Sequence, residues 1–96
     1  MFEWDPKKAA VNLAKHGVTF GAAATAFGDP LALDGPDVGH SAVETRFFRL
    51  GRSLLNRVLT VAYTRRKASH GEAIRIISAR CASRKERGAY RGTEED

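Results

Sequence analysis

The side chains that could carry chemistry gather near the end of the sequence. Arg80 ends a predicted strand, and more arginines follow it at helical spacing. Arg84, Arg87 and Arg91 stand at i, i+3 and i+7, so they are expected on one side of a last helix, with Tyr90 beside them. Arginine bonds phosphate bidentately, so the pattern predicts contacts to a nucleic acid backbone. The alternative is a solvated basic surface without a specific partner.

Two of the cations stand at the start of this helix, where the helix dipole disfavours them. Arg84 and Lys85 occupy the first turn, at a cost of about 0.3–1 kcal/mol each. This placement favours anion binding together with the free N–H groups of the helix start; the alternative is that both are exposed and solvated. Ser83 and Glu86 match a capping box, so Glu86 is expected to cap the helix rather than to act as a general base.

Three further side chains are weaker candidates. Ser78 has no His–acid pair in sequence reach and is a poor nucleophile, although its hydroxyl could bond a phosphate or orient Arg80. The alternative is a small residue at a strand end. Tyr90 could equally anchor the helix in the core, stack on a base or transfer a proton. His16 falls near a helix C-terminus, where a dipole-stabilised surface residue is more common than a catalyst.

No metal or cofactor site is predicted. His16, His40 and His70 belong to separate elements, and Cys81 is the only cysteine, so zinc-ligand spacing is absent. The sequence also lacks a P-loop and a glycine-rich nucleotide fingerprint. His40 and Ser41 are interpreted as turn and cap residues.

Length, composition and charge define the setting for these residues. The 96 residues, 43% hydrophobic and 28% charged, fit one globular domain spanning 1–96. Neither a membrane span nor a signal-peptide core is present, so a cytoplasmic location is expected. Residues 1–45 carry a net charge of −3, residues 46–96 carry +8, and residues 46–93 carry +11. A basic half of this kind indicates a polyanionic partner, most often nucleic acid.

The first third of the chain predicts a short strand and two helices. Residues 2–4 alternate between apolar and polar side chains, which predicts a short strand. Asp5 and Pro6 are typical of a helix start. Gly17 is expected to end that helix. Thr19 can cap a second helix that runs through Phe27, before the stop at 28–30.

The remainder predicts strands and a last helix. Strands are expected at 31–33, 45–50, 57–64 and 72–80, with turns at 35–37, 51–56 and 65–71. In the last strand Ile74, Ile76, Ser78 and Arg80 should share one face. Ser83 then opens the last helix. The order β-α-α-β-β-β-β-α defines an α+β domain whose last three strands form an antiparallel meander.

Ordered motifs along nearly the whole chain resemble BrnT-type toxins. The segments that carry the resemblance are 2–7, 12–20, 27–31, His40-Ser41, Glu44, 46–47, 50–51, 63–64, 74–80, 83–87 and Tyr90. The resemblance implies a RelE-like fold, with an antiparallel sheet, two N-terminal helices on one face and a short C-terminal helix. It implies a type II toxin that cleaves mRNA as a metal-independent endoribonuclease and arrests growth.

The resemblance also implies a site and a partner. The site falls on Arg66, Ser78, Arg80, Arg87 and Tyr90. The loop 65–71 is longer and more basic than is usual in the family, so either Arg65 or Arg66 can be the matching arginine. The implied partner is a ribbon-helix-helix antitoxin of the BrnA type, through which the complex would reach operator DNA. Because the +11 stretch must be neutralised, a heteromeric complex with an acidic or amphipathic antitoxin segment is expected.

Two hypotheses follow for the function. In the first, the substrate's own 2′-hydroxyl attacks the phosphate and arginines stabilise the developing charge. Arginine cannot act as a base, so the acid–base role would fall to Tyr90, Glu86 or His16. In the second, the chain is a non-catalytic nucleic-acid-binding or co-repressor module.

Overall fold

The computed structural model describes residues 1–40 and 44–94 and has the expected α+β composition. Its elements in chain order are β1 (Phe2–Glu3), α1 (Pro6–His16), α2 (Phe20–Thr25), the 3-10 helix η1 (Ala26–Gly28), β2 (Leu33–Pro36), the 3-10 helix η2 (Val38–His40), β3 (Arg46–Arg52), β4 (Val58–Ala68), β5 (Gly71–Cys81) and α3 (Arg84–Glu94).

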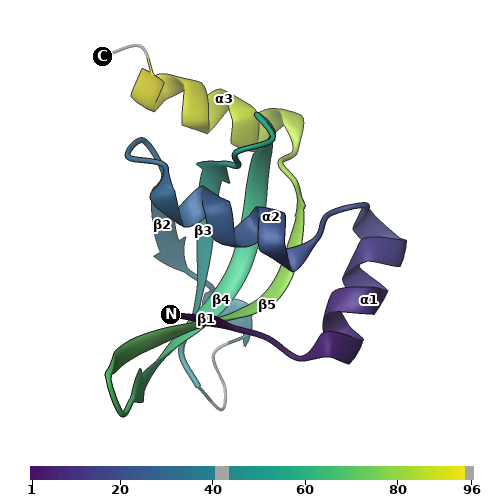
Figure 1. Cartoon of the computed structure of the whole chain (residues 1–96). Helices are drawn as coiled ribbons and strands as arrows, with labels where there is room; N and C mark the ends of the chain where they lie inside the picture. The colour runs from purple at the N-terminus through teal and green to yellow at the C-terminus, as the bar shows by residue number, and fades with distance from the viewer. Residues whose placement is uncertain (41–43, 95–96) are drawn as a thin grey trace.

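All five strands form one sheet in the order β1-β5-β4-β3-β2 (Figure 1). The long strands β3, β4 and β5 pair antiparallel with their neighbours in the chain, which confirms the predicted meander. β2 adds antiparallel to β3 at one edge, and β1 adds parallel to β5 at the other. The sheet therefore pairs the first strand of the chain with the last one.

The helix ends follow the chemistry of their residues. The Asp5 carboxylate accepts a hydrogen bond from the Lys7 N–H at 2.8 Å, and Pro6 occupies the first helical position of α1. Gly17 ends this helix in the left-handed conformation, at φ 68°. Thr19 caps α2 by accepting from the Ala22 N–H. None of the helices within the described ranges is long and apolar enough to cross a membrane.

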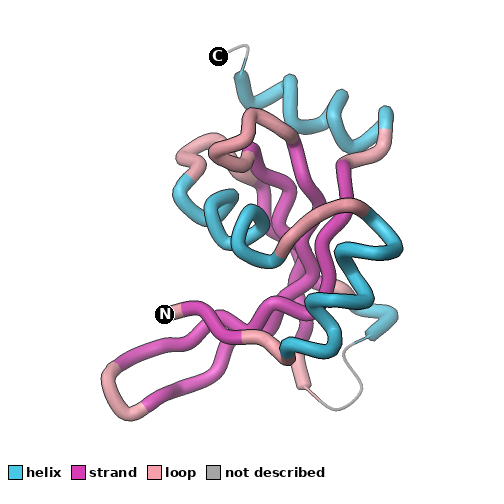
Figure 2. Tube along the Cα trace, turned by 45° about the vertical axis from the view of Figure 1, so that its right-hand side comes forward, coloured by secondary structure: helices cyan, strands magenta, loops and turns pink. Residues whose placement is uncertain are grey.

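The hydrophobic core lies between α1, α2 and one face of the sheet (Figures 1 and 2). Phe20 and Ala23 of α2 are buried against Leu59 and Val61 of β4. β5 adds small and branched side chains to the same core. The Ala-rich helices can approach closely because their contact residues are short.

The Asn12 side chain links α1 to β5 through hydrogen bonds. Its side-chain nitrogen donates to the carbonyls of Ala79 and Val18 at 2.8 and 2.9 Å, and its oxygen accepts from the Ala79 N–H at 3.1 Å. The side chain is buried. One amide therefore replaces the strand partner that β5 lacks at this point.

A β-bulge changes which side chains of β5 point to each face of the sheet, so the face predicted for this strand needs a correction. Ser78 pairs with Ala62, but Ile76 pairs with the next residue, Tyr63, so Ile77 is an extra residue in β5. The predicted face containing Ile76, Ser78 and Arg80 is therefore wrong. Strict alternation fails because the extra residue shifts the phase, and both Ile76 and Ala79 point into the core.

All three predicted turns are wrong in their boundaries. Residues 51 and 52 belong to β3, which pairs with β4 through Arg52. Residues 65–68 continue β4 and pair with β5, so the β4–β5 turn is limited to Ser69 and His70. The side chains of Arg65, Arg66 and Lys67 are all exposed, so the basic residues of this extension remain solvated. Residues 35 and 36 belong to β2, which pairs with β3 through Pro36. Of the interpreted turn residues, His40 ends η2, and Ser41 lies outside the described residues.

Candidate nucleic-acid interface

The second face of the sheet, opposite the hydrophobic core, carries the strand residues of the candidate site. Along β4, the residues between the core positions turn to this face, Thr60 and Ala62 among them. Thr60 pairs with Arg80, and Ala62 pairs with Ser78. Paired residues of antiparallel strands project to the same side. Ser78 and Arg80 therefore share the second face, although Ile76 does not.

The Arg80 guanidinium is fixed by Glu86 of α3. Its two terminal nitrogens donate to the two carboxylate oxygens at 2.7 and 3.0 Å. Thr60 Oγ1 and the Ser83 N–H also donate to Glu86 Oε1, at 3.0 and 2.8 Å. The predicted capping box is present, because the Glu86 N–H donates to Ser83 Oγ at 3.2 Å.

This arrangement sets the ionisation of both partners. The hydrogen bond from Arg80, with help from Ser83 and Thr60, lowers the pKa of Glu86 from 4.5 to about 2. The same bond raises the pKa of Arg80 above its usual value. Glu86 is thus a permanent carboxylate that orients Arg80, and it is a weak base.

Tyr90 anchors α3 to the rest of the fold. It is 2% exposed, and its hydroxyl donates to Asp29 Oδ2 at 2.5 Å. The same carboxylate oxygen accepts from the Arg52 N–H at 2.8 Å, and the Arg52 guanidinium lies over the Tyr90 ring at 5.4 Å. Burial and the bond to Asp29 raise the pKa of Tyr90. Burial alone would raise the pKa of Asp29, but the bonds from Tyr90 and Arg52 outweigh it and lower that pKa.

A basic pocket of about 350 Å³, here called the arginine pocket, lies between α3 and the β3–β4 turn. Its lining residues are Arg52, Asn56, Arg57, Val58, Cys81, Arg87, Tyr90 and Arg91. Arg80 adjoins it, since Arg80 and Arg87 donate to the consecutive carbonyls of Cys81 and Ala82 at 3.4 and 2.9 Å. Several guanidinium groups around one hollow can hold successive phosphates of a single strand.

Arg52 and Arg57 were absent from the residues predicted for the site. A signal for them existed, because Arg52 lies inside the predicted turn at 51–56 and Arg57 directly follows it. A hairpin brings the two flanks of its turn together at one end of the sheet. That end is the one from which α3 starts.

The structure brings most of the predicted site residues together at this end of the sheet. Those gathered here are Arg80, Arg84, Lys85, Glu86, Arg87, Tyr90 and Arg91. Arg84 and Lys85 are exposed on the first turn of α3. The helix therefore presents cations to solvent beside the pocket, while Glu86 and Tyr90 face the sheet.

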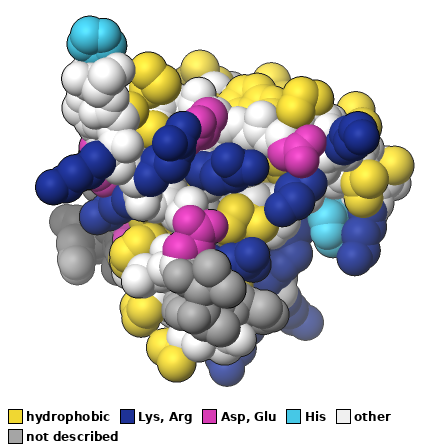
Figure 3. Space-filling model, turned by 90° about the horizontal axis from the view of Figure 1, so that it is seen from below, with side chains coloured by type: hydrophobic (Ala, Val, Ile, Leu, Met, Phe, Trp, Pro, Cys, Tyr) yellow, Lys and Arg dark blue, Asp and Glu magenta, His cyan; other side chains and the backbone are white. Residues whose placement is uncertain are grey.

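Arg65 and Arg66 lie at the opposite end of β4. From Thr60 to Arg66 the strand advances six residues, or about 20 Å at roughly 3.3 Å per residue. Arg66 donates to both oxygens of the Glu3 carboxylate through Nε and Nη2, and Arg65 lies over the Phe47 ring at 5.1 Å. Seen from below, Lys and Arg side chains gather across this end of the molecule (Figure 3). These two arginines therefore lie far along β4 from Arg80 and the arginine pocket.

Ser78 and His16 line a third feature, a groove of about 320 Å³ between α1 and β5. Lys7, Lys8 and Lys15 line the same groove. Ser78 thus lies two residues from Arg80 on the strand and borders a different hollow. Among residues 1–40 and 44–94, no three His, Cys, Asp or Glu side chains gather as metal ligands would.

Comparison with known proteins gives two matches in agreement. A family model described as "Ribonuclease toxin, BrnT, of type II toxin-antitoxin system" matches residues 4–86. The 1.1 Å crystal structure of the Brucella abortus ribonuclease toxin BrnT is similar, with a TM-score of 0.62 and 26% sequence identity. The alignment covers 88% of this chain and 99% of that one. Comparison with curated proteins gives no significant match.

Proposed function

The chain belongs to the BrnT family of ribonuclease toxins of type II toxin–antitoxin systems, and we propose that it is a metal-independent endoribonuclease that cleaves mRNA. The observation that carries the proposal is the Arg80–Glu86 pair beside the arginine pocket. The pair holds one guanidinium rigidly, and the pocket offers further cations for the neighbouring phosphates. We also propose that the fold is RelE-like, on the support of a five-stranded sheet with N-terminal helices.

The proposed chemistry is transesterification by the RNA itself. The 2′-oxygen forms a bond to phosphorus, the bond from phosphorus to the 5′-oxygen breaks, and a proton passes from the 2′-hydroxyl to the leaving oxygen through acid–base groups. Negative charge develops on the phosphoryl oxygens during this step. We assign the stabilisation of that charge to Arg80, because Glu86 orients its guanidinium before the substrate arrives.

The three side chains considered for proton transfer are occupied or distant. Glu86 has a pKa of about 2 and is committed to Arg80, so it accepts a proton poorly. The Tyr90 hydroxyl is buried and bonded to Asp29. His16 lines the groove beside α1 instead of the arginine pocket. We therefore assign this chain the roles of binding, orienting and stabilising charge, with Glu86 as a positioning residue.

The proposed partner is a ribbon-helix-helix antitoxin of the BrnA type. A type II system implies an antitoxin that binds the toxin directly. We expect the antitoxin to make this contact through an acidic segment, because residues 46–93 carry a net charge of +11. Contact with operator DNA would then occur through the antitoxin.

The test is cleavage of a defined RNA by purified protein, with and without EDTA. We expect cleavage that resists EDTA and yields 2′,3′-cyclic phosphate ends, which report attack by the 2′-oxygen. Cleavage abolished by EDTA would contradict metal independence. Binding without cleavage would instead support the second candidate function, a non-catalytic nucleic-acid-binding module. This candidate is favoured by the hydrogen bonds that already occupy the Glu86 carboxylate and the Tyr90 hydroxyl.

A further inference from the structure

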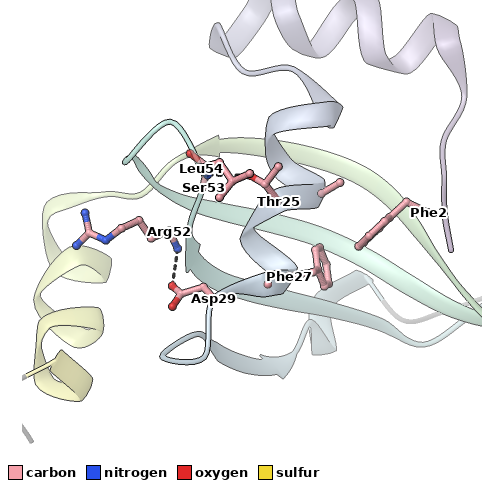
Figure 4. A pocket seen from close by; sticks show the side chains of 9 residues that line it. Phe2, Thr25, Phe27, Asp29, Arg52, Ser53 and Leu54 are labelled. Carbon is pink, nitrogen blue, oxygen red and sulfur yellow. Dashed lines mark hydrogen bonds between the residues drawn. The ribbon is translucent and has the colours of Figure 1, made fainter.

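An apolar groove of about 710 Å³ runs beside the arginine pocket (Figure 4). Phe2 and Phe27 pack edge to face in its wall, with ring centroids 5.2 Å apart. Ala24 and Thr25 of α2 and Leu54 complete much of the lining. An open apolar groove of this size on a small protein is typical of a binding surface.

The groove is bordered by a turn that presents two leucines to solvent. Ser53 and Arg57 close the turn through the Ser53 N–H and the Arg57 carbonyl at 2.9 Å, and Asn56 adopts the left-handed conformation at φ 62°. Leu54 and Leu55 at the tip are 84% and 69% exposed. Turn tips normally carry polar residues, so two exposed leucines need a separate reason.

This turn is held in place by the neighbouring helix. The Leu54 N–H donates to Thr25 Oγ1 at 2.9 Å, and that hydroxyl donates to the Ala22 carbonyl at 2.6 Å. The leucine pair is therefore presented on a fixed support, which lowers the entropy lost when a partner covers it.

Arg52 joins the groove to the arginine pocket. It lines both hollows. Its backbone N–H is bonded to Asp29 beside the groove, and its side chain extends toward α3 (Figure 4). One continuous surface therefore passes from apolar walls to a group of four arginines.

We propose that an amphipathic, acidic segment of the antitoxin docks on this surface. Its apolar side chains cover Leu54 and enter the groove, and its carboxylates meet Arg52, Arg87 and Arg91. The segment thereby occupies the arginines that would otherwise hold RNA. The inference rests on the proposed function, because it explains how the partner silences the same site.

The chemistry of the surface selects this occupant. A second copy of the chain would bring a second set of arginines to the same place, and like charges oppose that contact. RNA would satisfy the arginines but would leave the exposed leucines uncovered. An acidic amphipathic segment satisfies both halves of the surface.

The test compares two toxin variants that carry matched changes. Leu54→Asp alters the groove rim, and Val38→Asp alters an equally exposed apolar residue in η2, since the two are 84% and 82% exposed. The probe is the antitoxin encoded beside this toxin, titrated onto each purified variant, with cleavage of a defined RNA measured in parallel. We expect Leu54→Asp to weaken antitoxin binding at least tenfold, to retain cleavage, and to escape neutralisation. Val38→Asp should behave like the wild type.

The remaining outcomes separate this inference from the proposed function. The docking surface is refuted if the Leu54→Asp variant binds the antitoxin with the affinity of the wild type. It is also refuted if the wild-type chain forms no complex with the antitoxin. If the toxin forms a dimer that Leu54→Asp dissociates, the groove binds a second copy of the chain. If Leu54→Asp loses RNA binding, the groove binds RNA. Either result overturns the inference. A wild-type chain that binds antitoxin through Leu54 but leaves RNA intact refutes only the proposed function.

Discussion

Replacing Arg80 by alanine should abolish most RNA cleavage while the fold survives. The substitution removes both hydrogen bonds to Glu86, but the Thr60 hydroxyl and the Ser83 N–H still donate to that carboxylate. Glu86 therefore keeps its capping role. The side chains of Arg80 and Glu86 are 43% and 29% exposed, so water can solvate the carboxylate that remains.

The two effects differ in size, which makes the prediction sharp. Loss of a solvent-accessible ion pair costs stability of about 1 kcal/mol or less. Loss of one fixed donor to a developing oxyanion costs about 2.7–4 kcal/mol in the transition state, or roughly a hundredfold to a thousandfold in rate. Arg80→Lys should lose less, because the charge stays although the bidentate geometry is gone.

The assay is single-turnover cleavage of a defined RNA, with urea denaturation of the same preparations. Arg75→Ala is the matched control, since Arg75 lies on the same strand and face at the far end of the sheet. Growth arrest on expression without antitoxin gives a cellular measure. Arg84→Ala should mainly weaken RNA binding and reduce its salt slope by about one. Full cleavage by a folded Arg80→Ala protein would refute the reasoning and direct attention to Arg57 and Arg87.

Four further changes have defined outcomes. The pKa of Glu86 is about 2 in the folded protein and 4.5 in the unfolded chain. The stability it contributes is therefore present above pH 4.5 and lost as pH falls toward 2; Glu86→Gln should cost about 1 kcal/mol at pH 7 and little at pH 2, by urea denaturation. Asn12→Ala should cost about 2–4 kcal/mol, because it leaves the buried Ala79 backbone groups unpaired; an unchanged midpoint would contradict this role. Tyr90→Phe should lower stability by about 1 kcal/mol and keep cleavage, whereas lost cleavage in a stable variant would make Tyr90 an acid–base group. Arg66→Ala should weaken RNA binding and spare the cleavage step in single-turnover assays, since Arg66 lies far along β4 from Arg80.

The order of elements could be predicted because local chemistry determines it. Asp5, Pro6, Gly17 and Thr19 mark helix ends through their own hydrogen bonding and backbone preferences, and all four do so in the structure. The capping box at Ser83 is local in the same sense. Such signals span three or four residues and need no tertiary contact.

The facing of β5 could not be predicted, because the bulge at Ile77 depends on pairing with β4. Its sequence has no glycine at that point, and strict alternation wrongly places Ser78 and Arg80 on the face of Ile76. The site was incomplete for a similar reason. Asp29 and Arg52 are far from α3 in sequence, and only the folded chain shows that they meet Tyr90.

The position of α3 explains why these distant residues belong to the site. Cations in its first turn and Gly88 in its middle weaken the helix on its own. Two side chains one turn apart compensate for this: Glu86 binds Arg80 of the sheet, and Tyr90 binds Asp29. Since Arg87 and Arg91 follow these anchors by one residue each, fastening the inner face of the helix also fixes the direction of its arginines toward the pocket. The same contacts that stabilise α3 therefore direct the arginines that we propose as the binding site for the phosphates of an RNA strand.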